Sequence, residues 1–141
     1  RGVNIGLGTD GAASNNRLDL LSEMSIAALL AKGASGDATA LPAHQALAMA
    51  TLNGAKALGL EQEIGSLKPG KAADIVAIEL ATLETAPLYD VASHLVYVAG
   101  REQVTDVWVS GKRLLSSRTL TTLDAHELAA KAAHWQGVLK S

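Results

Sequence analysis

The 141-residue sequence has no cysteine and no phenylalanine, and aromatic residues make up only 3% of it. Without cysteine there is no disulfide, no thiolate ligand for a metal and no cysteine nucleophile, a composition compatible with the cytoplasm. No apolar run approaches the roughly 18 residues that a membrane-spanning helix needs. Acidic and basic residues nearly balance, 14 against 12, with no basic cluster. We therefore expect a cytoplasmic protein that binds neither a membrane nor nucleic acid.

The beginning of the sequence also lacks familiar features. Arg1 to Asn4 show no basic region leading into an apolar stretch and a cleavage site, as a signal peptide would. There is no initiator methionine either, so we expect the sequence to begin partway through a larger protein. Apolar material is plentiful, because 48% of the residues are hydrophobic, mostly alanine and leucine. The length predicts a single domain.

The stretch from Val3 to Asn16 carries the first chemical suggestion. Val3 to Leu7 is typical of a buried strand, and Asp10 follows it at the start of a loop of small residues. Barrels of alternating strands and helices place their catalytic residues at such strand ends. Aspartate and glycine are also common in ordinary turns, so a lone Thr9-Asp10-Gly11 is more often a simple turn.

Three helices are predicted from apolar residues at helical spacing and from their capping residues. The first begins at Asp19, runs to about Ala31 and is closed by Lys32 and Gly33, and the others span 42–58 and 125–139. Glycine in a helix costs about 1 kcal/mol relative to alanine, so Asn53-Gly54 marks either a close contact or a break in the second helix.

Strand signals dominate from Leu60 onward. Ala73 to Leu80 contains a β-branched run typical of a buried strand. Val104 to Val109 and the apolar pair after Arg113 predict a hairpin around Ser110-Gly111. Within the less clear stretch 83–98, residues 95–98 fit either a strand or the end of a helix that begins at Asp90.

Gly8 to Asn16, followed by Leu18-Asp19, resembles the last barrel strand of the amidohydrolase superfamily. More narrowly, it resembles the branch that holds the methylthioadenosine/S-adenosylhomocysteine deaminases and the triazine hydrolases. Three later stretches resemble the same branch in the same order, at 39–43, 64–74 and 87–97. The resemblance runs from Gly2 to about Leu128.

This resemblance implies an α/β fold that is only the C-terminal fragment of an enzyme. Residues 1–59 would be the C-terminal part of a metal-dependent hydrolase (β/α)8 barrel, with its last strand and the helices that follow. Residues 60–121 would be the C-terminal strands of a composite β-sandwich domain, and residues 122–141 a terminal helix.

The resemblance also implies a role for Asp10, as a ligand of a divalent metal, usually zinc, and as a proton shuttle. A metal lowers the pKa of bound water to about 7, and a neighbouring carboxylate accepts the remaining proton. Ser14, Asn15 and Asn16 are expected to orient that carboxylate.

The other metal ligands of the superfamily have no counterpart in this sequence. A zinc site needs three or four ligands, but the His-x-His pair, the later histidines and the catalytic glutamate are missing. His44, His126 and His134 are predicted to lie on the surface, whereas His94 lies in a family motif and is more often structural than site-adjacent.

Several further residues are predicted from the sequence to have structural roles or no role in catalysis. Asp74 is predicted to fix the turn after Pro69-Gly70, and Val91 stands where the superfamily usually has proline. No acid–base partner is apparent in the sequence for three glutamates, Glu23, Glu61 and Glu63.

Three functional hypotheses follow. In the first, the parent enzyme is a metal-dependent deaminase that hydrolyses the C–N bond at C6 of an adenine nucleoside such as methylthioadenosine or S-adenosylhomocysteine. This chain alone would then be inactive. In the second, it is a non-catalytic assembly fragment that forms a homo-oligomer through an exposed strand edge. In the third, the parent is a triazine or guanine-type hydrolase of the same branch.

Overall fold

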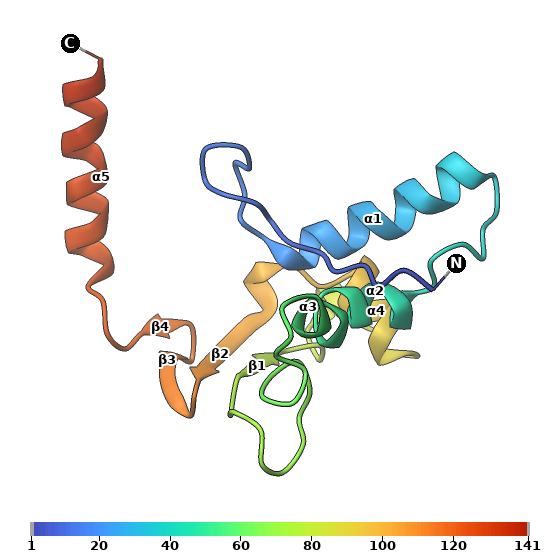
Figure 1. The fold of residues 1–141 in the computed structure, drawn as a ribbon. Coiled ribbons are helices and arrows are strands. Elements are labelled where there is room, and N and C mark those ends of the chain that lie inside the picture. The colour runs from blue at the N-terminus through green and yellow to red at the C-terminus, as the bar shows by residue number, and fades with distance from the viewer. Residues whose placement is uncertain (1, 141) are drawn as a thin grey trace.

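The structure is a computed structural model that describes residues 2–140. Its helices are α1 (Leu20–Ser35), α2 (Ala43–Met49), α3 (Leu52–Ala57), α4 (Val91–Tyr97) and α5 (Ala125–Leu139), with 3-10 turns at Leu83–Thr85 and Arg101–Gln103. Its strands are β1 (Ile75–Ile78), β2 (Val104–Val109), β3 (Lys112–Ser116) and β4 (Thr119–Leu120). Helices α1 to α4 lie together beside the sheet, and α5 projects away from both (Figure 1).

Helix α1 begins as predicted and ends later. The carboxylate of Asp19 caps it by accepting hydrogen bonds from the backbone N–H groups of Leu21 and Ser22, at 3.2 and 3.3 Å. The predicted stop at Gly33 is wrong, because the helix continues to Ser35. Gly36, with φ of 68°, adopts the left-handed conformation that ends the helix.

The predicted helix over 42–58 is two helices, α2 and α3. The chain breaks at Thr51, whose φ and ψ are −130° and −99°, and not at Asn53-Gly54. Gly54 marks a close contact instead, because a Cβ atom on Gly6 would lie 3.0 Å from the Cα atom of Gly54. The absence of a side chain on Gly6 lets the first segment pass directly against α3.

Residues 95–97, for which both a strand and a helix were considered, form the end of helix α4. Asp90 caps α4, and its carboxylate accepts a hydrogen bond from the backbone N–H of Ser93 at 2.7 Å. One face of α4 then completes the core, which consists of Met24, Ala28, Ala43, Ala46 and Val96. Alanine supplies most of this core, and its small side chain lets α1, α2 and α4 pack closely.

The four strands form one antiparallel sheet in the order β1-β2-β3-β4. The predicted hairpin is confirmed, with Ser110 and Gly111 both at positive φ (49° and 78°), as its tight turn requires. The prediction that Asp74 fixes the turn after Pro69-Gly70 is wrong, because its side chain holds the hairpin turn instead. Its carboxylate accepts a hydrogen bond from the backbone N–H of Ser110 at 2.7 Å, across the sheet from β1.

The predicted buried strand at Val3 to Leu7 is neither buried nor paired within residues 2–140. Val3 and Ile5 are 76% and 55% exposed. A strand needs a hydrogen-bonded neighbour, and this segment instead lies against α2 and α3. It is held by a hydrogen bond from the N–H of Leu7 to the carbonyl of Met49 and another from the Asn4 amide to the carbonyl of Asn53, both 2.9 Å.

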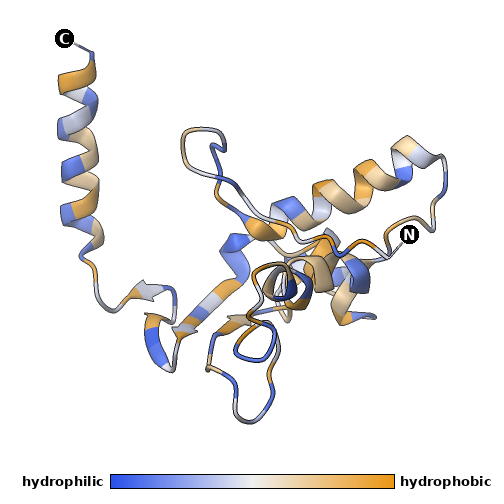
Figure 2. Ribbon diagram, in the orientation of Figure 1, coloured by the Kyte–Doolittle hydropathy of each residue, from blue (hydrophilic) through white to orange (hydrophobic). Residues whose placement is uncertain are grey.

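Helix α5 has the predicted bounds, and its predicted apolar stripe is exposed along the whole helix. Leu128, Trp135 and Leu139 are 43%, 60% and 83% exposed. Apolar residues lie along α5 with no other element beside them (Figure 2). Among residues 2–140, none of the helices has both the length and the apolar character needed to cross a membrane.

Candidate functional site

Asp10 stands at the end of the first segment, where the chain turns into the loop that leads to α1. Its backbone has a φ of 56°, a left-handed value that aspartate tolerates better than most residues. The hydroxyl of Ser14 donates a hydrogen bond to Oδ2, and the N–H of Gly11 donates one to Oδ1, each at 2.7 Å. The local backbone thus holds both carboxylate oxygens of an exposed side chain.

These two hydrogen bonds favour the charged form of Asp10. The Ser14 hydroxyl, and after it the Gly11 N–H, hold the pKa of the Asp10 carboxyl below its ordinary value. The group is therefore ionised at neutral pH. An ionised carboxylate of fixed orientation can accept a proton or bind a cation.

Of the three residues expected to orient Asp10, Ser14 alone contacts it. Asn15 braces the loop instead. Its Oδ1 accepts hydrogen bonds from the N–H groups of Arg17 and Leu18, at 2.9 and 3.2 Å, and its Nδ2 donates to Oε1 of Glu23 at 2.7 Å. The Asn16 side chain is exposed and makes no hydrogen bond within the described part of the chain.

Glu23 is therefore a residue that sequence reasoning missed. It lies eight positions after Asn15, and only the turn of the loop back onto α1 brings the two side chains together. The sequence carried one signal, an acidic residue in the first turn of a helix, and this is common for reasons unrelated to any site.

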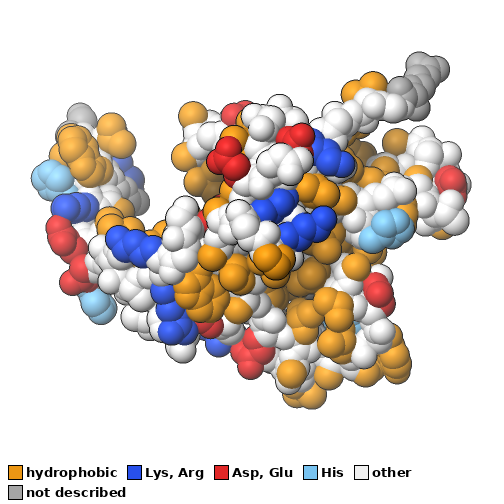
Figure 3. Space-filling view, turned by 60° about the horizontal axis from the view of Figure 1, so that its bottom comes forward, with side chains coloured by type: hydrophobic (Ala, Val, Ile, Leu, Met, Phe, Trp, Pro, Cys, Tyr) orange, Lys and Arg blue, Asp and Glu red, His pale blue; other side chains and the backbone are white. Residues whose placement is uncertain are grey.

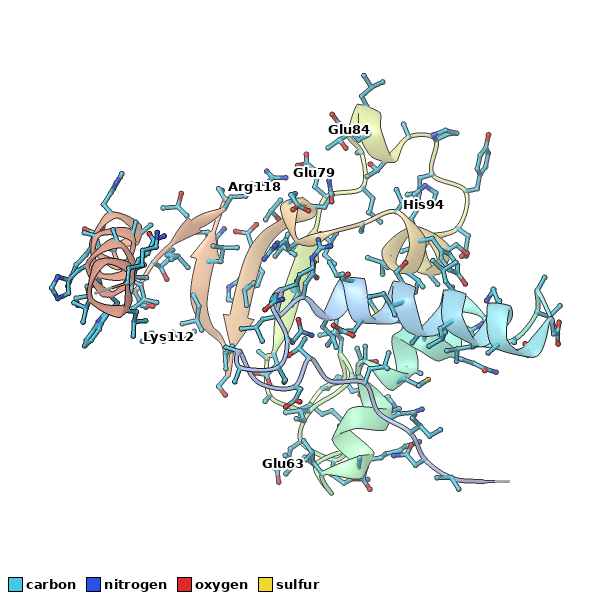
Figure 4. All side chains as sticks on the ribbon, turned by 90° about the horizontal axis from the view of Figure 1, so that it is seen from above. Glu63, Glu79, Glu84, His94, Lys112 and Arg118 are labelled. Carbon is cyan, nitrogen blue, oxygen red and sulfur yellow. The ribbon has the colours of Figure 1, made fainter. Side chains whose placement is uncertain are left out.

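His94 has a structural role, as its more frequent interpretation predicted. Its Nδ1 lies 3.1 Å from the carbonyl oxygen of Asp90, and its Nε2 lies 3.0 Å from that of Thr85. The ring thus joins α4 to the 3-10 turn at Leu83–Thr85, on the same side of the molecule as Glu84 (Figure 4). His44, His126 and His134 are exposed, as predicted.

The residues around Asp10 do not make a complete zinc site. Nowhere between residues 2 and 140 do three or more histidine, cysteine or acidic side chains converge as metal ligands. Since zinc takes three or four protein ligands, Asp10 supplies one of them at most. Any further ligands would have to come from residues other than these.

Comparison with known proteins identifies a consistent set of relatives. The amidohydrolase family matches residues 1–114. The chain is 54% identical over 136 residues to the 5-methylthioadenosine/S-adenosylhomocysteine deaminase of Teredinibacter turnerae. This alignment covers 96% of this chain and 31% of that protein. It therefore spans about a third of the length of the curated relatives it matches.

Solved structures agree with this match. An adenosine deaminase of Xanthomonas campestris with bound zinc superposes with a TM-score of 0.94 at 51% identity, over 98% of this chain and 31% of that one. The atrazine chlorohydrolase of Arthrobacter aurescens, complexed with zinc, gives a TM-score of 0.86 at 30% identity, over 94% and 30%.

These similarities confirm the predicted fold class at the level of the family. The chain corresponds to a C-terminal part of the amidohydrolase fold, with helices beside an antiparallel sheet. The division after residues 59 and 121 stays a prediction. With more than half of its residues matched, the chain belongs to the amidohydrolase family.

Proposed function

We propose that the complete protein is a metal-dependent hydrolytic deaminase of an adenine nucleoside, with Asp10 as the catalytic residue that this chain contributes. 5'-Methylthioadenosine and S-adenosylhomocysteine are the proposed substrates, and the bond cleaved is the C–N bond at C6. The observation that carries the proposal is the ionised, doubly hydrogen-bonded carboxylate of Asp10, in a chain 54% identical to a deaminase of these nucleosides.

Asp10 is suited to move one proton during such a reaction. A divalent metal, proposed to be zinc as in the two similar structures, would supply a water of pKa about 7 at the site. Asp10 would bind that metal through its carboxylate, accept a proton as the water attacks C6, and donate it to the departing ammonia. The hydrogen bonds from Ser14 and Gly11 keep the carboxylate charged and aimed before the proton arrives.

Two other functions of the complete protein are alternatives. The similarity to atrazine chlorohydrolase supports hydrolysis of a triazine as the second candidate. The exposed apolar side chains of Val3 and Ile5 support a non-catalytic assembly role through the first segment. A cytoplasmic location and a homo-oligomer belong to the proposal as well.

The test uses the complete protein and an isosteric pair of variants. Asp10→Asn keeps the shape of the side chain and removes its charge, so we expect bound zinc to fall and turnover of methylthioadenosine to drop by about 10²–10⁴-fold. Glu63→Gln makes the same change at an exposed carboxylate beside α3 (Figure 4) and is expected to leave both unchanged.

Zinc per chain is measured, together with ammonia release from methylthioadenosine and S-adenosylhomocysteine and chloride release from atrazine. Turnover of atrazine alone would favour the triazine alternative. Wild-type turnover by Asp10→Asn would remove Asp10 from the mechanism. A wild-type protein without zinc or turnover would leave only the assembly role.

A further inference from the structure

We propose that Asn15 and Glu23 act together as positioning residues, fixing the direction in which Asp10 presents its carboxylate; this inference rests on the proposed function. Asn15 is half-buried and uses both ends of its amide. Its oxygen accepts from the N–H groups of Arg17 and Leu18, and its nitrogen donates to Glu23 at 2.7 Å. Glu23 lies on α1, so this pair joins the loop to a helix.

The turn that holds Asp10 makes no other side-chain hydrogen bond to a helix within residues 2–140. The carboxylate of Asp10 accepts from Gly11 and Ser14, and its carbonyl accepts from the hydroxyl of Thr9 at 3.1 Å. The carbonyl of Gly11 accepts from the N–H groups of Ser14 and Asn15 at 3.0 Å each. These contacts shape residues 10–15 into a turn. They do not fix how that turn sits relative to the helices.

The Asn15–Glu23 hydrogen bond ends on a helix that packs into the core, because α1 contributes Met24 and Ala28 to it. The N–H of Glu23 donates to the carbonyl of Asp19, whose side chain caps the helix, and Met24 beside it is 3% exposed in the core. A second tie joins Arg101 to the carbonyl of Arg17 at 3.3 Å, but it holds the exposed far end of the loop. Of these two side-chain bonds that hold the loop after Asp10, the Asn15–Glu23 bond is the shorter and the more buried.

A carboxylate that binds a metal tolerates little misorientation. Loss of a partner that orients a ligand typically costs 10–100-fold in metal affinity or activity. Neither Asn15 nor Glu23 touches the Asp10 carboxylate, so both would act through the turn. Their effects must then be coupled through the bond they share, and Asn15→Ala additionally removes the bonds from Arg17 and Leu18.

The test is a double-mutant cycle in the complete protein, with Asn15→Ala, Glu23→Ala and both together. Zinc affinity is measured by competition with a chelator, loop opening by amide hydrogen exchange over residues 11–18, and kcat with methylthioadenosine. We expect each single variant to lose about 10–100-fold in zinc affinity and to exchange faster in the loop. The double variant should be no worse than the poorer single variant.

Two further variants separate positioning from a general loss of structure. Glu23→Gln keeps an oxygen that accepts from Asn15, so it should retain zinc affinity within about threefold, the small change left when the bond itself is kept. Glu63→Ala removes an exposed glutamate elsewhere and should leave the affinity and the loop exchange unchanged.

The inference is overturned if the single variants bind zinc as the wild type does, if their losses add in the double variant, or if loop exchange is unchanged. Exchange is measured without metal, so it tests the tie even if the wild-type protein proves not to be a deaminase. An active wild type with unaffected variants would reject this inference and leave the proposed function standing.

Discussion

Helices α1 and α5 have similar lengths and the same kind of N-terminal cap, but opposite environments. They have 16 and 15 residues, and each begins at an aspartate whose side chain accepts two backbone hydrogen bonds. On α1, the apolar stripe is buried, with Met24 and Ala28 at 3% and 0% exposure, whereas Trp135 on α5 is 60% exposed. Apolar periodicity therefore predicts that a helix forms and which face is apolar, but not whether anything covers that face.

The difference arises from what lies beside each helix. Helix α1 meets α2 and α4, whose Ala43, Ala46 and Val96 complete the core. Helix α5 follows the short strand β4 and contacts none of the other helices (Figure 1). Apolar side chains are also prominent on the outer face seen in Figure 3. A groove of about 400 Å³ between α1 and the sheet, lined by Met24, Leu47, Ile78 and Val107 among others, adds to this open apolar surface.

The largest test of this comparison truncates one apolar side chain on each helix. Met24→Ala should lower the free energy of unfolding of this chain by about 2–5 kcal/mol, because it leaves a cavity among packed neighbours. Leu128→Ala on α5 should change it by less than about 0.5 kcal/mol, since this side chain is 43% exposed. Urea unfolding followed by circular dichroism measures both. If Leu128→Ala lowered the free energy of unfolding by more than about 1 kcal/mol, as truncation of a buried residue does, α5 would be covered in solution.

A smaller test compares the two capping residues. Asp19→Ala should cost about 1 kcal/mol of global stability, since α1 is part of the core. Asp124→Ala should leave global stability nearly unchanged and raise amide exchange over the first turn of α5, because an isolated helix of about 15 residues is marginal in water. Equal global losses for both variants would mean that α5 unfolds together with the core.

Much of the local structure could be predicted because short-range chemistry determines it. The cap at Asp19, the Ser110-Gly111 hairpin and the bounds of α5 each depend on a few neighbouring residues. Asp10 and Ser14 are four residues apart and were predicted together for the same reason.

What the sequence did not reveal depends on distant partners. The first segment was predicted as a buried strand, but burial and pairing need neighbours that residues 2–140 do not supply. The Asn15–Glu23 bond requires the loop to fold back on α1, and the helix breaks at Thr51, where no glycine or proline marks it in the sequence. Gly33 was taken as a stop, yet one glycine inside a well-packed helix costs only about 1 kcal/mol.

The smallest expected effect lies in the sheet that joins the helical core to α5. The guanidinium of Arg113 and then the N–H of Ser117 lower the pKa of Asp106 from 3.8 to about 2. A carboxylate whose pKa is lower in the folded protein stabilises the fold above its unfolded pKa and loses that contribution as the pH falls. Asp106 should therefore contribute its full share above about pH 4 and lose it progressively down to about pH 2.

Asp106→Asn isolates this contribution, because the other carboxyls with lowered pKa values remain in both proteins; they are Asp10, Asp37, Glu84 and Asp90. We expect the urea midpoint of the wild type to fall more steeply than that of the variant between pH 4 and pH 2, and the two curves to run parallel above pH 5. The difference should be small, since the Arg113 side chain is 45% exposed and water weakens the pair. If α5 and the sheet unfold separately from α1, the difference will appear in a probe of Trp108 in β2 and not in the helical signal. That outcome would extend the contrast between the two helices to the strands that connect them.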